Sequence, residues 1–293
     1  MIQKSKKKTQ REEKSRSSVR EKSKSKAKKR FGAKNNSSKR ELSLSAIPQR
    51  PGRWVVGFHS VLEILKVRPQ QVGELWIQSE LVKDASLLEI RQLANLYQFP
   101  VDFVSSKQLG ILGGGKSGVA CRVLETPKLN WDILGEQERA TVVVLDELVD
   151  PQNLGGILRT SWLMGVDGIL VSKNRAVHLT PTVCKIASGG AEYVPVDIHT
   201  NLPRALTLLK EKGFWIYGFE EKGASDLWQT RFPEKVALVI GSEEKGMRSS
   251  IRSECDELVK ICQVPSGRSY NASVAAALAV GEVCRQRQEV KEK

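Results

Sequence analysis

The sequence is poor in the side chains that bind metal ions and build disulfide frameworks. Its 293 residues include three histidines and five cysteines, and the cysteines are widely spaced without a C-x-x-C pair: Cys121, Cys184, Cys255, Cys262 and Cys284. This pattern predicts no metal site and favours reduced thiols in a cytoplasmic protein. No apolar run approaches the roughly 18 residues that a membrane-spanning helix needs, so a membrane protein is not expected.

The excess of positive charge is confined to one end of the chain. Of 47 Lys and Arg and 33 Asp and Glu, residues 1–50 hold 18 and 4, which leaves 29 of each sign in residues 51–293. Any surface for a polyanion in the folded part must therefore be a local patch. Residues 1–50 are rich in Lys and Ser and have one aromatic residue, so we expect a disordered basic tail. A flexible arm that contacts phosphates explains this composition, and a solubilising extension is the alternative.

Apolar runs alternate with helix-compatible segments through the rest of the chain. We expect a small α/β domain at residues 51–125, a linker at 126–136 and a larger α/β domain at 137–293. In the larger domain the pattern predicts strands at 142–145, 168–171, 193–196, 215–218, 235–240 and 257–261, and helices at 181–188, 202–212 and 273–289. Strands separated by helices predict a mostly parallel sheet that is covered on both faces.

Three polar loops that contain glycine each follow a predicted strand of the larger domain. They run from Asp146 to Gly156, from Gly241 to Gly246 and from Cys262 to Asn271. Parallel α/β sheets bind ligands at the carboxyl ends of their strands, so we expect the three loops to form one site. Arg159, one turn beyond the first loop, brings a cation to it. Each loop alone is equally compatible with an ordinary turn, and Ser273 is a natural N-cap for the last helix.

A phosphate-loop motif in the smaller domain is interpreted as a chance match. Residues Gly110–Ser117 fit G-x-x-x-x-G-K-[ST], but that motif requires a buried strand before it and a helix after it. Here the next residues, Val119–Leu124, are predicted to form a strand. We therefore expect no ATP hydrolysis, and we expect a mobile loop in which Lys116 is available to a phosphate.

The loops of the larger domain together resemble the motifs of the SpoU/TrmH branch of the SPOUT RNA methyltransferases. The matching segments are DPQNLGGILRT (150–160), KIASGGAEYVPV (185–196), LVIGSEEKGM (238–247) and SYNASVAAA (269–277). The smaller domain, which begins VVGFHSVLEIL (55–65), is similar to the ribosomal-protein-L30e-like module of rRNA guanosine 2′-O-methyltransferases in this branch. The resemblance implies a parallel-sheet SPOUT fold with a C-terminal trefoil knot, a homodimer, and S-adenosylmethionine as cofactor.

The resemblance also implies roles for single residues. The catalytic set would be Asn153, Arg159, Glu243, Ser269 and Asn271, the cofactor contacts would be Gly218, Gly241, Ile261 and Tyr270, and RNA would be contacted by Arg159 and Lys116. A guanidinium resists deprotonation, so we expect Arg159 to stabilise charge and position a phosphate rather than to act as a base.

These inferences predict an S-adenosylmethionine-dependent RNA ribose 2′-O-methyltransferase that modifies a guanosine of large-subunit rRNA. Methyl transfer from a sulfonium is an in-line displacement, which requires a positioned nucleophile and a route for its proton but no metal ion. Two alternatives stay open. The substrate could be tRNA, or the chain could be a catalytically inactive RNA-binding or ribosome-assembly protein of the same fold.

Overall fold

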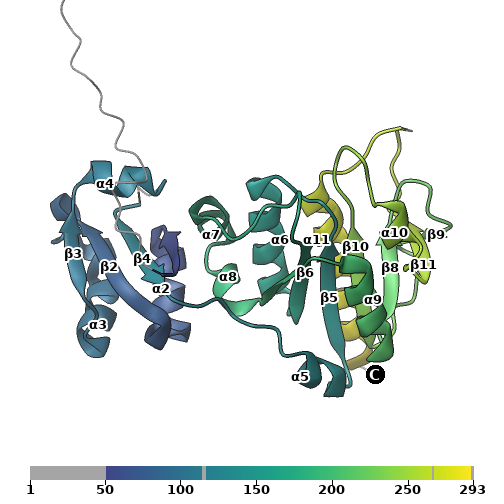
Figure 1. Cartoon of the computed structure of the whole chain (residues 1–293), viewed down its shortest axis with the longest axis horizontal. Helices are drawn as coiled ribbons and strands as arrows, with labels where there is room; N and C mark the ends of the chain where they lie inside the picture. Colours follow the sequence, from purple (N-terminus) through teal and green to yellow (C-terminus); the bar gives the residue numbers. More distant parts are fainter. Residues whose placement is uncertain (1–50, 114–116, 266, 292–293) are drawn as a thin grey trace, which may run out of the picture. The chain divides into compact units, whose positions relative to one another are not determined.

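A computed structural model describes residues 51–113, 117–265 and 267–291 of the chain. The predicted tail, residues 1–50, and Lys116 lie outside the described residues, so both remain predictions. The described residues form two sheets, one of four strands and one of seven (Figure 1). No helix in these three ranges combines the length and the apolar character that spanning a bilayer requires.

The four-stranded sheet lies within residues 51–125 and has the order β1-β4-β2-β3. Its strands are β1 (Arg53–Val56), β2 (Val72–Gln78), β3 (Val101–Val104) and β4 (Val119–Val123), with helices α2 (Phe58–Val67), α3 (Leu88–Tyr97) and α4 (Ser106–Ile111) and the short 3₁₀ helices η2 (Pro69–Gln71), η3 (Ser79–Leu81) and η4 (Ala85–Leu87). Strand β4 is antiparallel to β1 and β2, whereas β2 and β3 are parallel. Because β4 is central, all five of its residues are buried.

The surroundings of the Gly110–Ser117 motif differ from those of a phosphate loop. Helix α4 comes before the loop and strand β4 comes after it. A phosphate loop has the opposite order, because the N-terminus of the following helix must face the phosphates. The structure therefore agrees with the interpretation of this motif as a chance match.

The seven-stranded sheet has the order β7-β6-β5-β10-β8-β11-β9, and all its strand pairs are parallel. Its strands are β5 (Ala140–Leu145), β6 (Gly168–Ser172), β7 (Val196–His199), β8 (Trp215–Phe219), β9 (Ser225–Asp226), β10 (Lys235–Ile240) and β11 (Glu257–Lys260). The helices are α5 (Trp131–Glu136), α6 (Pro151–Leu163), α7 (Pro181–Ala187), α8 (Gly190–Tyr193), α9 (Leu202–Glu211), α10 (Ser249–Arg252) and α11 (Ala272–Lys291). The predicted α/β class and mostly parallel sheet are confirmed.

Strand β5 shows why the sheet is covered on both faces. Val143 and Leu145 belong to the core cluster that includes residues of α6 and α11, whereas Val142 and Val144 belong to the cluster that includes residues of α9. Successive side chains of a strand point to opposite faces, so a continuous apolar run fills both cores. Figure 1 shows α6 and α11 beside each other on one face of the sheet.

Helix α6 begins at a helix-start signal in the sequence, the pair Asp150-Pro151. The Asp150 side chain accepts a hydrogen bond from the backbone N–H of Gln152, and Pro151 occupies the first helical turn. An aspartate N-cap followed by proline satisfies one free backbone donor and fixes φ for the helix. This local signal sets the position of every α6 residue relative to the end of β5.

Two details of the predicted secondary structure were wrong. The strand expected at 193–196 begins only at Val196, because Gly190–Tyr193 form the short helix α8. The last helix is capped by Asn271 rather than by Ser273. The Asn271 carbonyl accepts from the Ala275 N–H, and the Asn271 side chain accepts from the Ser273 N–H at 3.0 Å. Residues 131–136 of the predicted linker form α5, which buries Leu134 in the sheet's second core cluster.

Candidate active site

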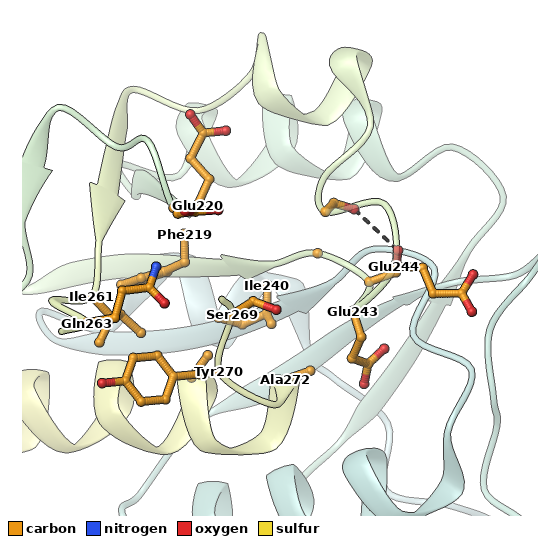
Figure 2. A pocket seen from close by; sticks show the side chains of 15 residues that line it. Phe219, Glu220, Ile240, Glu243, Glu244, Ile261, Gln263, Ser269, Tyr270 and Ala272 are labelled. Carbon is orange, nitrogen blue, oxygen red and sulfur yellow. Dashed lines mark hydrogen bonds between the residues drawn. The ribbon is translucent and has the colours of Figure 1, made fainter. Parts of the chain in front are cut away.

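Two of the three predicted loops, those after β10 and β11, meet the loop after β8 at the carboxyl edge of the seven-stranded sheet, whereas no residue of the predicted loop after β5 lines the cavity there. Strands β10, β8 and β11 are neighbours, so the loops that follow them lie next to one another. Together they enclose a cavity of about 350 Å³, here called the loop pocket. It is lined by Phe219, Glu220, Glu221, Ile240, Gly241, Ser242, Glu243, Glu244, Gly246, Ile261, Gln263, Ser269, Tyr270, Ala272 and Ala275 (Figure 2). This volume is within the range of small-molecule sites.

The loop after β10 is closed tightly on itself. Ser242 and Gly246 exchange two backbone hydrogen bonds, of 3.1 and 2.9 Å, and Gly246 has a φ of 67°, which favours glycine. A Cβ at Gly241 would lie 2.3 Å from the carbonyl carbon of Gly246, so no larger residue fits there. Glycines at both ends thus make the narrow loop that forms one wall of the loop pocket.

An ion pair between a buried carboxylate and an exposed guanidinium holds the same loop against strand β5. The Asp146 side chain is completely buried directly after β5, and it accepts hydrogen bonds from the Arg248 backbone N–H at 2.9 Å and from Arg248 Nε at 2.8 Å. This hydrogen bonding raises the pKa of Arg248. The sequence pattern predicted only that Asp146 begins a turn, although an acidic residue at the end of a buried strand is a signal for such a partner.

The third loop closes the opposite side of the pocket. Tyr270 Oη donates to the Cys262 carbonyl at 2.9 Å, and the Gly267 N–H donates to Glu221 of the loop after β8 at 3.0 Å. In Figure 2, Tyr270 and Ile261 lie on one side of the cavity and Glu243 lies on the other. The pocket is therefore enclosed by segments that are far apart in sequence.

The predicted catalytic residues fall into two groups. Glu243 and Ser269 line the loop pocket, and the Asn153 side chain, which is buried at the start of α6, donates to Glu243. Asn271 is not a lining residue of the loop pocket, although its chain neighbours Tyr270 and Ala272 are, and its side chain accepts from the Ser273 hydroxyl at 2.6 Å. Arg159 is not among the lining residues of the loop pocket.

Three of the four predicted cofactor contacts, Gly241, Ile261 and Tyr270, line the loop pocket as well. Gly218 does not, although its neighbour Phe219 does. A Cβ at Gly218 would come within 2.7 Å of the Cys255 sulfur, so packing beneath the pocket accounts for this glycine.

Arg159 instead lines a second cavity, here called the basic pocket. This cavity has a volume of about 510 Å³ and is lined by Val56, Leu112, Gly113, Gln152, Arg159, Thr182, Lys185, Ile186 and Ser188. The Arg159 side chain is exposed, and its Nη1 donates to Ser188 Oγ at 3.5 Å. Gln152 of α6 lines the basic pocket, while Asn153, the next residue, bonds to Glu243, so the start of α6 connects the two cavities.

The predicted first loop ends earlier than expected, because α6 begins at Pro151 and the pair Gly155-Gly156 lies inside this helix. The pair packs helices together. A Cβ at Gly155 would lie 2.6 Å from Ile186 Cβ of α7, and one at Gly156 would lie 3.3 Å from Ser273 Cβ of α11. The neighbours of this pair are thus α7 and α11. Gly155-Gly156 therefore set the spacing of the helices around the site.

The two pockets differ in charge. The loop pocket has four glutamates and no Lys or Arg among its lining residues. Glu220 is paired with Arg252 at 2.6 Å, but within the described part of the chain no ion pair is found for Glu221, Glu243 or Glu244. The loop pocket is thus suited to a ligand with positive charge, and the basic pocket to an anion.

Comparisons with known proteins match two separate segments of the chain. The model of the SpoU rRNA Methylase family matches residues 140–281, and that of the RNA 2′-O ribose methyltransferase substrate-binding domain matches residues 54–125. A protein of Staphylococcus haemolyticus assigned to the TrmH family of tRNA/rRNA methyltransferases is 37% identical over 242 residues, which cover 80% of this chain and 96% of that protein. A Staphylococcus saprophyticus protein with the same assignment is 36% identical over 245 residues, 82% and 98% of the two chains.

Solved structures of such proteins share the fold. The SpoU methyltransferase AviRb of Streptomyces viridochromogenes, crystallised with AdoMet, aligns with a TM-score of 0.71 and 22% identity over 80% of this chain and 90% of its own. An AdoMet-bound rRNA methyltransferase of Sinorhizobium meliloti aligns with a TM-score of 0.67 and 20% identity over 80% and 87%. The matched family models, the relatives and the shared fold together show that this chain belongs to the SpoU/TrmH family of RNA methyltransferases.

Proposed function

We propose that the chain is an S-adenosylmethionine-dependent RNA ribose 2′-O-methyltransferase that modifies a guanosine of large-subunit rRNA. The observation that carries this proposal is the pairing of an acidic pocket with a basic one at the start of α6. A cationic methyl donor matches the first and an RNA phosphate matches the second. The substrate-binding family model at residues 54–125 supports RNA ribose as the acceptor.

The loop pocket has the features that S-adenosylmethionine requires. Gly241 and Gly246 line the pocket without a side chain, so backbone atoms of the second loop are open to a ligand there. Ile240, Ile261 and Phe219 offer an apolar wall for an adenine ring. The glutamates of the pocket provide favourable potential for a sulfonium and an ammonium group. When bound, the cofactor supplies an electrophilic methyl group.

The chain's own residues would prepare the ribose hydroxyl. Arg159 stabilises negative charge on the 2′-oxygen or on a neighbouring phosphate, because its guanidinium keeps its positive charge. Glu243 is oriented by the Asn153 amide, so it is held at the edge of the loop pocket. Ser269 offers a hydroxyl to the ribose or the cofactor, and Asn271 fixes the last loop to the start of α11.

We further propose that the active enzyme is a homodimer. Large apolar side chains are exposed on the two helices beside the site: Leu163 and Val274 are 68% and 44% exposed, on α6 and α11 respectively. Burial of such side chains favours association. A second copy on this surface would lie close to both pockets. Leu163→Glu should shift the elution and scattering mass from dimer to monomer, whereas a monomeric wild-type chain would contradict this part of the proposal.

The reaction can be tested with tritium-labelled S-adenosylmethionine and two RNA substrates, large-subunit rRNA and bulk tRNA, both from cells that lack the protein. We expect label in the rRNA and resistance of the methylated position to alkaline cleavage, because 2′-O-methylation removes the attacking hydroxyl. Label in tRNA alone would replace rRNA by tRNA as the substrate.

The non-enzymatic alternative predicts a different set of results. In that case the wild-type chain would bind RNA but transfer no methyl group, and calorimetry would detect no cofactor binding. The Arg159→Ala variant separates the two possibilities, because an enzyme should lose methyl transfer while cofactor binding persists. If wild type transfers no methyl to any RNA and Arg159→Ala binds RNA equally well, the enzyme proposal fails.

A further inference from the structure

The basic pocket contains two cations from different helices. Arg159 comes from α6 and Lys185 from the last turn of α7, and both side chains are exposed. The pocket has no Asp or Glu among its lining residues. Its other polar groups, on Gln152, Thr182 and Ser188, are neutral. The side chains that line this cavity therefore give it a positive potential.

Neither cation is neutralised within the residues that the structure describes. Lys185 Nζ donates to the Gly113 carbonyl at 3.5 Å, and Arg159 donates to a serine hydroxyl. No ion pair is found for either side chain in residues 51–113, 117–265 and 267–291. By contrast, the nearby Arg248 is bound to a carboxylate. Two unneutralised cations in one cavity are an arrangement that binds an anion.

The backbone places the two cations on the same cavity by close helix packing. A Cβ at Gly190 would lie 2.7 Å from the Leu158 carbonyl oxygen, and Gly155 lies against Ile186, so α6 and the end of α7 approach closely. Helix α7 ends with Ser188 at a φ of 51° and Gly189 at a φ of 107°. This left-handed turn brings the Ser188 hydroxyl to Arg159. The glycines of both segments thus allow the close approach of α6 to the end of α7.

The pocket also has an apolar wall. Val56 and Leu112 are buried, and Ile186 is partly buried beside them. A cavity of about 510 Å³ with cations, neutral donors and aliphatic side chains suits a nucleotide, whose phosphate is anionic and whose sugar or base is partly apolar. Because Val56 and Leu112 come from residues 51–125, the pocket joins the smaller sheet's segment to the catalytic segment.

We infer that the basic pocket binds a phosphodiester of the RNA chain, with Lys185 as the second phosphate-binding cation beside Arg159. This inference rests on the proposed function, since it assumes that the substrate is RNA. It adds a role for Lys185, which donates three hydrogen bonds as a compact point charge. The contact positions the RNA strand and does not read its sequence.

The test compares the full-length chain with Lys185→Ala, Lys185→Arg and the control Lys173→Ala, an exposed lysine of the same segment that lines neither pocket. Binding of fluorescein-labelled large-subunit rRNA transcript is measured by anisotropy between 50 and 300 mM KCl. We expect Lys185→Ala to weaken binding about tenfold and to reduce the slope of log K against log salt by about 0.7 to 1. Lys185→Arg should restore most of the affinity, and Lys173→Ala should behave as wild type.

A second measurement separates a phosphate contact from a general structural role. In methyl-transfer assays, Lys185→Ala should raise KM for RNA while kcat and the cofactor dissociation constant stay at the wild-type values. Wild-type affinity and an unchanged salt slope in Lys185→Ala would overturn the inference. If instead the wild type transfers no methyl group but its RNA binding still depends on Lys185, the proposed reaction fails and the phosphate site stands.

Discussion

The loop pocket and the basic pocket share the start of helix α6, but they are built in different ways. Backbone loops at the ends of three strands form the first, and its shape depends on glycines that no other residue can replace. Side chains on two packed helices contribute the charges of the second. Backbone loops fix a shape, whereas exposed cations can be removed without disturbing the core. Substitutions should therefore affect stability at the first pocket and chemistry at the second.

The largest expected effect is on catalysis, from Arg159→Ala in the basic pocket. The loss of one preorganised charge at the reacting oxygen should lower kcat by about 100-fold or more. The stability and the dissociation constant of the cofactor should not change, because the side chain is exposed and lies outside the loop pocket. Single-turnover methyl transfer and calorimetry measure these quantities. A kcat within threefold of wild type, roughly the scatter of such assays, would remove Arg159 from the reaction.

The next effect is on stability, from Arg248→Ala beside the loop pocket. This change removes the guanidinium that pairs with the fully buried Asp146 carboxylate. Of the hydrogen bonds from residue 248, only the one from its backbone N–H remains. Urea unfolding should show a loss of roughly 3 kcal/mol, and cofactor affinity should fall because the loop after β10 is released.

The surface pair Arg139–Glu234 is the control for that experiment. Both side chains are substantially exposed, so Arg139→Ala should cost less than about 1 kcal/mol. Equal losses for Arg139→Ala and Arg248→Ala would show that burial of Asp146 does not determine the stability of the loop.

The two glycines of α6 provide a smaller and sharper comparison. An Ala at position 155 would collide with Ile186 of α7 and come within 3.1 Å of the Val183 carbonyl oxygen, so we expect a destabilisation of about 1–3 kcal/mol. At position 156 the contact with Ser273 is 3.3 Å, and the gain of about 1 kcal/mol in helix propensity should offset it. Thermal unfolding of both variants tests this order, which would be contradicted by a less stable Gly156→Ala.

The smallest effect expected is on thiol reactivity, which reports how accessible the third loop and helix α7 are to solvent. Cys262 is exposed in the third loop, whereas Cys184 is buried on α7 directly before Lys185. Burial raises the pKa of Cys184 to about 11, so little thiolate is present at pH 8. Iodoacetamide followed by peptide mass mapping should label Cys262 first. Labelling of Cys184 at the same rate would show that α7 opens readily.

Most of the sheet follows from local patterns in the sequence. The strand predicted at 235–240 has the same bounds as β10, because its apolar run is buried on both faces. The short helix α8 was missed because four residues between two turns carry no helical period. The cap of α11 was misassigned to Ser273 because Asn271 and Ser273 are both favourable capping residues, and the choice depends on the path of the preceding loop.

The site, too, was predicted only in part from the sequence. The motif order identified the loops that carry Glu243 and Ser269, and these residues line one pocket. It placed Arg159 in the same site, but the structure assigns it a separate cavity together with Lys185. Because one turn of a helix changes which neighbour a side chain meets, spacing along the chain does not give that partner. The trefoil knot and the L30e-like character of residues 51–125 remain predictions.

The sequence by itself determined the alternation of strands and helices and the motifs that mark the family. Each of these depends on residue type and on near neighbours in the chain. Only the tertiary structure decided that Asp146 binds Arg248, that Gly155 and Gly156 let α6 pack closely against α7 and α11, and that Arg159 and Lys185 line one cavity. These contacts join residues far apart in sequence, and they exist because the order of the parallel strands brings distant loops to one edge of the sheet.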